Sequence, residues 1–123
     1  MPAAINLETQ FARFTETWSP HIVGELNGQH VKLFKLEGDK CPWHSHAGED
    51  EMFLILDGTL DIHLRDSVVP VGPGEFFIVR KGLEHRVVPR GPVRGLLFEP
   101  ATTAHTGDVQ SDITLQEYRS LVD

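Results

Sequence analysis

The sequence predicts a single all-β domain, and three observations carry that prediction. Turn-forming residues recur at short, even intervals along the 123-residue chain, and the segments between them are rich in strand-forming residues. Several of these segments are apolar on both faces, as is typical of strands that are covered on both sides. The length suits one core, so we expect one domain over residues 1–123, with its strands at about residues 20–100.

Two dipeptides predict the first hairpins. Asn27-Gly28 separates the strand-like residues 22–26 from 30–36, and Asn-Gly favours a type I′ turn because both central positions need a positive φ. Asp57-Gly58 lies in the same way between residues 51–56 and 59–64. Further breaks at Gly and Pro delimit three later strands, residues 75–79, 84–88 and 93–99.

The segment at residues 51–56 predicts a strand that is buried on both faces. One face carries Glu51, Phe53 and Ile55, and the other carries only apolar residues: Met52, Leu54 and Leu56. One face can line the interior, while the other needs the opposite sheet, a terminal segment or a second subunit as its cover. We therefore expect a homodimer.

The two ends predict short helices. Residues 6–14 place Leu7, Phe11 and Phe14 at helical spacing, with Asn6 as the N-cap. Residues 114–122 show similar spacing, and Thr114 with Glu117 forms a capping-box pattern. Residues 101–111 are small and polar, which predicts a loop.

Composition and charge exclude several classes of function. The net charge is −7 and Lys and Arg form no cluster, so we expect no nucleic-acid partner. No signal peptide is evident, and the longest apolar stretch, residues 52–56, is too short to cross a membrane. The single cysteine, Cys41, excludes an internal disulfide and fits a cytoplasmic protein. No phosphate-binding glycine loop or serine nucleophile elbow is recognisable.

Four residues predict a metal site: His44, His46, Glu51 and His85. The two histidines at i and i+2 share one face of a strand, Glu51 begins the next strand, and His85 follows the Lys81-Gly82 turn of a separate hairpin. Such a nitrogen and oxygen ligand set suits zinc, copper, iron, nickel or manganese. Four protein ligands leave one or two positions of a five- or six-coordinate ion open, which is typical of catalytic sites.

Several neighbouring residues compete with this set and are expected to lie outside it. Asp50 has the opposite strand parity to Glu51, and Glu49 falls in a turn. Strand parity also turns Cys41 and Trp43 away from the two histidines, Cys41 as a small hydrophobe and Trp43 as a packing or interface residue. Ordinary structural or surface roles are expected for the other histidines, His21, His30, His63 and His105.

The expected pocket lining is apolar. Phe53 and Ile55 share the parity of Glu51, and Val87 shares that of His85. Four further residues are candidates whose register the sequence leaves open: Phe34, Phe76, Ile78 and Phe98. Such a lining favours a small, partly apolar or aromatic ligand.

The spacing of Gly38, His44, His46, Glu51 and Gly58 resembles the first motif of the cupin superfamily. The second cupin motif is matched at Gly74, Gly82 and His85, while Arg80 and Pro89 stand where the family usually has proline and often has asparagine. The resemblance spans residues 31–98. It implies a double-stranded β-helix, or jelly-roll, barrel with a metal near one mouth, and it agrees with a dimer.

The metal motif within this resemblance implies a protein that binds one divalent ion, Fe, Mn, Zn or Ni, together with a small-molecule substrate or ligand. We favour a metal-dependent enzyme, with a dioxygenase-like oxidoreductase preferred to an isomerase. The alternative is a small-ligand-binding or sensor module without catalysis. No particular residue is singled out as catalytic beyond the four proposed ligands.

Overall fold

The structure is a computed structural model that describes residues 3–104, 106, 107, 109, 111, 113 and 118–121. It is almost entirely β, as predicted. One short helix precedes the strands, and the elements in chain order are α1 Leu7–Phe11, β1 His21–Leu26, β2 Gln29–Leu36, β3 Glu51–Leu64, β4 Val68–Val71, β5 Phe76–Val79, β6 His85–Pro100 and β7 Arg119–Ser120.

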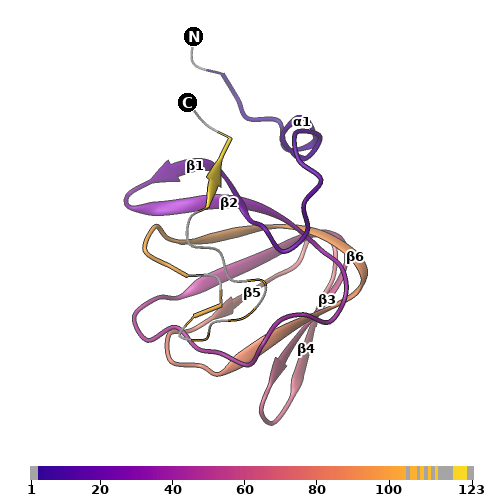
Figure 1. The fold of residues 1–123 in the computed structure, drawn as a ribbon, viewed down its shortest axis with the longest axis vertical. Coiled ribbons are helices and arrows are strands. Elements are labelled where there is room, and N and C mark those ends of the chain that lie inside the picture. The colour runs from indigo at the N-terminus through magenta and orange to yellow at the C-terminus, as the bar shows by residue number, and fades with distance from the viewer. Residues whose placement is uncertain are drawn as a thin grey trace.

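The strands form one curved, seven-stranded sheet that is not closed into a barrel. Its order is β4-β3-β6-β2-β1-β7, with β5 also paired to β3. Figure 1 shows how the long strands β3 and β6 curve around the interior, with β1 and β2 at one side and β4 at the other. Segments far apart in the sequence therefore contribute side chains to one interior space.

The first predicted hairpin is confirmed. Strands β1 and β2 pair antiparallel around Asn27 and Gly28, whose φ angles of 51° and 75° are those that a type I′ turn requires.

The second predicted hairpin is wrong, because β3 continues straight through Asp57 and Gly58 and pairs with β6 on both sides of them. The same ladder joins the predicted strands at residues 84–88 and 93–99 into the single strand β6. Register shifts occur between Ile55 and Thr59, and Gly58 has a φ of 79°. A Cβ at Gly58 would lie 2.5 Å from the Pro92 carbonyl oxygen, so the glycine admits an irregular ladder rather than a chain reversal.

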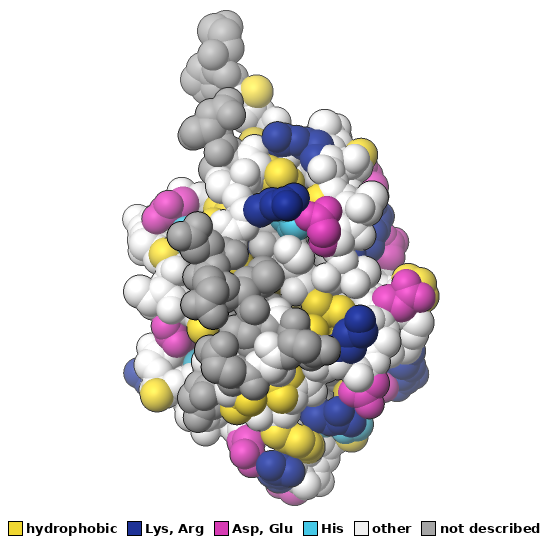
Figure 2. Space-filling view, viewed as in Figure 1, with side chains coloured by type: hydrophobic (Ala, Val, Ile, Leu, Met, Phe, Trp, Pro, Cys, Tyr) yellow, Lys and Arg dark blue, Asp and Glu magenta, His cyan; other side chains and the backbone are white. Residues whose placement is uncertain are grey.

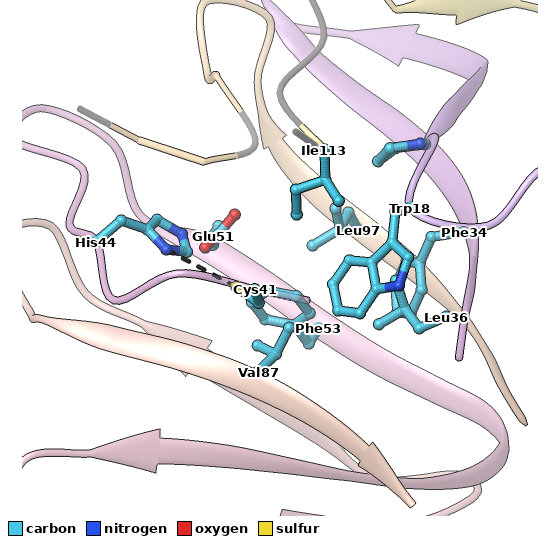
Figure 3. A pocket seen from close by; sticks show the side chains of 11 residues that line it. Trp18, Phe34, Leu36, Cys41, His44, Glu51, Phe53, Val87, Leu97 and Ile113 are labelled. Carbon is cyan, nitrogen blue, oxygen red and sulfur yellow. Dashed lines mark hydrogen bonds between the residues drawn. The ribbon is translucent and has the colours of Figure 1, made fainter. Parts of the chain in front are cut away.

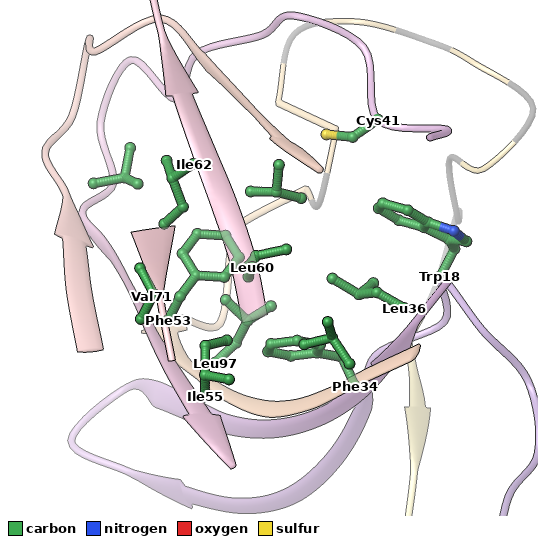
Figure 4. Packing of buried hydrophobic residues seen from close by; sticks show 13 residues of the cluster. Trp18, Phe34, Leu36, Cys41, Phe53, Ile55, Leu60, Ile62, Val71 and Leu97 are labelled. Atoms are coloured by element: carbon green, nitrogen blue, oxygen red, sulfur yellow. The ribbon is translucent and has the colours of Figure 1, made fainter. Parts of the chain in front are cut away.

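The interior core lies inside the curve of the sheet (Figure 4). Phe53 and Ile55 of β3 point inward, as their parity predicts, and pack among residues from β2, β5 and β6. A second cluster lies on the outside of β1 and β2, where Phe11 and Phe14 of the N-terminal segment pack against Val23 and Leu33 and reach Leu56. The N-terminal segment therefore supplies part of the predicted second cover.

The N-terminal helix is confirmed, although it is shorter than expected. The Asn6 side chain accepts a hydrogen bond from the Thr9 backbone N–H and caps it. Thr114 and Glu117 lie outside the described residues. At the end of the predicted C-terminal helix, Arg119 and Ser120 instead form β7, which pairs parallel with β1, so the helix is wrong there.

The described residues contain no helix whose length and apolar character would allow it to cross a membrane. On the face shown in Figure 2, basic and acidic side chains are interspersed.

Candidate metal centre

The structure brings the four predicted residues together. His44, His46, Glu51 and His85 are all buried, and one nitrogen or oxygen atom from each lies within 4.8 Å of those of the others. Glu51 is the first residue of β3 and His85 the first of β6, while both other histidines lie in the loop between β2 and β3. This buried His/Glu cluster could hold a metal ion.

Backbone hydrogen bonds hold the loop of His44 and His46 against the turn before β6. His44 and His85 form an isolated antiparallel bridge, in which the N–H of each donates to the carbonyl of the other at 2.9 Å. The Gly82 N–H donates to the His46 carbonyl at 2.7 Å. The prediction that His44 and His46 share a regular strand is wrong, since this bridge and turn position them instead.

Two imidazole rings are oriented by backbone carbonyls. Nδ1 of His44 lies 2.8 Å from the Pro42 carbonyl oxygen, and Nδ1 of His85 lies 2.9 Å from that of Leu83. A carbonyl oxygen only accepts hydrogen bonds, so we assign the N–H of each ring to Nδ1. Nε2 is then left with a lone pair, which is the form that binds a metal.

The cluster combines a carboxylate with a histidine that is held neutral. Oε1 of Glu51 lies 3.1 Å from Nε2 of both His46 and His85. Burial by itself raises the pKa of Glu51, but the close approach of His46 and His85 outweighs burial and brings the pKa below its ordinary value. Burial lowers the pKa of His44 to about 4. Deprotonated groups of this kind are the forms that ligate a metal.

A buried ion pair that the sequence did not single out adjoins the cluster. Lys32 of β2 donates from Nζ to Oε1 of Glu99 on β6 at 2.8 Å, and both side chains are 0 % exposed. The carboxyl group of Glu99 also contacts that of Glu51, and burial together with the charge of Glu51 raises the pKa of Glu99 well above its ordinary value. Strand parity could have found both residues, because Lys32 shares its face with Phe34 and Glu99 shares its face with Leu97.

An apolar cavity begins at the cluster (Figure 3). His44 and Glu51 line one end, and the rest of its wall consists of Cys41 and apolar residues: Trp18, Pro20, Phe34, Leu36, Phe53, Val87, Leu97 and Ile113. The volume of the cavity is about 40 Å³, which is room for a few waters or one small group.

Three of the expected lining residues are confirmed: Phe34, Phe53 and Val87. Ile55 is buried in the core without lining the cavity. The remaining candidates face elsewhere, because Phe76 is 60 % exposed and Ile78 and Phe98 line an open groove outside the sheet.

The prediction that Cys41 points away from the histidines is wrong. Its Sγ lies 3.9 Å from Nδ1 of His44 and faces the same cavity, because residues 41–43 are not in a strand and parity does not apply there. Burial raises the pKa of the Cys41 thiol to about 11, which keeps it protonated and unreactive. Trp43 packs instead against the Arg65 guanidinium, whose Cζ lies 3.9 Å from the centre of the Trp43 ring.

The competing residues lie outside the cluster, as expected. Asp50 accepts a hydrogen bond from the Lys81 backbone N–H, and Glu49 accepts one from the Thr102 hydroxyl. His21 stacks on Phe14. His30 and His63 also lie elsewhere in the described part of the chain, and His105 is outside it.

The chain is similar to several known proteins. One curated relative is the uncharacterised protein YdbB of Bacillus subtilis, which is 32% identical to this chain over 65 residues. These residues cover 52% of this chain and 57% of the relative. The chain thus spans little more than half the length of that relative.

Two crystal structures resemble this one over most of its length. A cupin-2 domain protein from Shewanella frigidimarina is 36% identical with a TM-score of 0.76, covering 78% of this chain and 93% of the other. Protein NMB1881 from Neisseria meningitidis is 28% identical with a TM-score of 0.72, covering 80% of this chain and all of the other. These likenesses confirm the predicted jelly-roll fold.

The cupin domain family model matches residues 32–99, more than half of the chain. This range contains both motifs identified in the sequence and all four residues of the buried cluster. The chain therefore belongs to the cupin superfamily.

Proposed function

We propose that the protein binds one divalent metal ion through His44, His46, Glu51 and His85 and uses it in chemistry on a small molecule. The observation that carries this proposal is the approach of four potential ligand atoms to within 4.8 Å of one another in a buried site. A divalent cation would accept the lone pairs and neutralise the carboxylate that converge in this buried site.

A bound ion would act as a Lewis acid and leave coordination positions open to the small molecule. The chain's own residues supply the surroundings. The carbonyls of Pro42 and Leu83 fix two imidazole rings, while the apolar walls restrict water and accept a small apolar or aromatic group.

Within this proposal we favour a dioxygenase-like oxidoreductase over an isomerase. The described residues that line the cavity include no Lys or Arg that could hold a phosphate, and an apolar wall suits a substrate with little charge. The competing function is a small-ligand-binding or sensor module without catalysis. In the present conformation the cavity admits only a small group, which limits the size of the substrate or ligand in either function.

Metal analysis tests the ligand set. We expect protein purified without a histidine tag to carry about one equivalent of ion, and the double variant His44→Ala/His46→Ala to carry none, since it removes two of four ligands. Retention of one equivalent by the folded double variant, measured by elemental analysis, would show that the ligand set is wrong. Turnover that is lost on chelation and restored by one metal would favour the enzyme over the binding module.

We also propose a cytoplasmic homodimer. Met52, Ile78 and Phe98 line an open groove on the outside of β3, β5 and β6, and a second copy could cover these apolar side chains. A monomer mass that stays constant with concentration in sedimentation experiments would refute the dimer.

A further inference from the structure

The buried Lys32–Glu99 pair is costly to maintain in an apolar interior. Both side chains are 0 % exposed, so the Lys32 ammonium group and the Glu99 carboxyl group have lost their hydration. Replacing a buried ion pair by apolar residues of similar volume is often neutral or stabilising. The surrounding interior is apolar, with Phe34 and Leu36 beside Lys32 on β2 and Leu97 beside Glu99 on β6.

The sheet register places this pair directly behind Glu51. Met52 of β3 is the partner of Phe98 on β6, so Glu51 and Glu99 lie next to each other at the ends of that ladder and on its inner face. On the other side of β6, Lys32 is the partner of Leu97 and reaches Glu99 diagonally. Three neighbouring strands thus contribute a line of charged groups that ends at the cluster.

Contacts along this line connect Lys32 to Glu51. Nζ of Lys32 donates a hydrogen bond to Oε1 of Glu99, and the carboxyl group of Glu99 contacts that of Glu51. Oε2 of Glu99 is fully buried and meets no hydrogen-bond donor among the described residues. Behind Lys32, the Tyr118 ring lies 3.4 Å from Nζ and limits where the ammonium group can move.

We propose that Glu99, held in place by Lys32, is a positioning residue that orients the Glu51 carboxylate toward the metal. This inference rests on the proposed function, since it assigns a partner to one of the four proposed ligands. Outer partners of this kind fix the rotamer of a ligating carboxylate, and their loss typically weakens metal binding by about 10- to 100-fold. Glu99 itself is not among the four residues whose ligand atoms converge.

The test compares variants of Glu99 by their affinity for Co²⁺, measured by competition with a chelator, and by the visible spectrum of the Co²⁺ complex. Glu99→Gln keeps an acceptor for Lys32 and offers Glu51 an N–H in place of the carboxyl O–H, so we expect an affinity within about threefold of the parent. Glu99→Leu keeps neither, and we expect about a 10- to 100-fold loss with a changed spectrum.

A double variant keeps the test decisive if Glu99→Leu fails to fold with Lys32 unpaired. Lys32→Met/Glu99→Leu removes both polar groups, so we expect it to fold and to show the same loss of Co²⁺ affinity. Leu60→Met, a buried change on β3 away from the cluster, is the matched control and should bind like the parent.

The outcomes separate this inference from the proposed function. If the parent takes up no Co²⁺, the metal centre and the inference both fail. If the parent binds Co²⁺ and the folded double variant binds it equally well with the same spectrum, only the positioning role is refuted. A loss in Glu99→Gln as large as that in Glu99→Leu would also refute it, because the hydrogen bonds would then not be the cause.

Discussion

Inside the curved sheet, the half that carries the candidate metal centre and the half that carries the apolar core are built from opposite kinds of residue. The first contains four buried His and Glu side chains and the Lys32–Glu99 pair. The second contains aromatic and aliphatic side chains, among them Phe34 and Phe53, whose rings meet edge to face with centroids 6.2 Å apart. The same strands, β2, β3 and β6, supply both halves.

Because of this difference, residues that stabilise the fold and residues that could bind a metal lie at different positions along one strand, β3. Burying apolar surface stabilises the folded state, whereas burying charges and imidazoles costs free energy unless each one is paired. On β3, Phe53 and Ile55 lie two and four residues after Glu51 on the same face. We therefore expect substitutions in the apolar half to change unfolding and substitutions in the polar half to change metal binding.

The largest effect on stability is expected for Phe34→Ala. Phe34 is 1 % exposed, and its loss leaves a cavity, so we expect the free energy of unfolding to fall by about 3–5 kcal/mol. Urea denaturation monitored by circular dichroism measures this change. Metal content of the folded variant should stay at the parent level.

The matched control is Phe76→Ala, which removes a ring that is 60 % exposed and should cost less than about 0.5 kcal/mol. Equal losses in the two variants, or loss of the metal from folded Phe34→Ala, would break the division between the two halves.

An intermediate effect is expected for pH acting on the polar half of the metal-free protein. The pKa of His44 is about 4 in the folded state against an ordinary 6.5, so between these values the unfolded chain binds more protons. Stability therefore rises with pH across this window, and the contribution of His44, present above pH 6.5, is lost as the pH falls through 4. We expect it to be about 1–3 kcal/mol.

His44→Gln isolates this contribution, because it removes the imidazole that titrates while the carboxyl groups of the protein remain in place. The parent should lose more stability than the variant between pH 7 and pH 5 in urea denaturation. Parallel losses in both proteins would show that His44 is not held neutral by burial.

The sequence predicted the polar half better than its surroundings. His44, His46, Glu51 and His85 are rare residue types at a specific spacing, and spacing survives any error in strand boundaries. Lys32 and Glu99 were missed because charged residues are ordinarily exposed, and only their strand parity indicates that they point inward. Their pairing also joins residues 67 positions apart, which local patterns do not reveal.

The wrong predictions of secondary structure share one cause, which is that pairing between strands distant in the sequence decided the outcome. Gly58 has the positive φ that the dipeptide predicted and Asp57 does not, and only the partner strand β6 decides between a hairpin and an irregular ladder. Strand β4 was not predicted because it contains Pro70, which an edge strand tolerates. Arg119 and Ser120 form a strand because the edge of β1 is available to them.

The smallest effect is expected where the C-terminal segment contacts the polar half. The Tyr118 hydroxyl donates to the Thr103 carbonyl at 2.7 Å, while the ring lies against Lys32. Tyr118→Phe keeps the ring and loses this hydrogen bond, so we expect a cost of about 1 kcal/mol in the free energy of unfolding and an unchanged Co²⁺ affinity. Tyr118→Leu also removes the aromatic face above the ammonium group and should cost a further 0.5–1 kcal/mol, roughly the strength of one such contact. If the two variants unfold at the same urea concentration, the ring does not stabilise Lys32, and the line of contacts ends at Lys32 rather than at Tyr118.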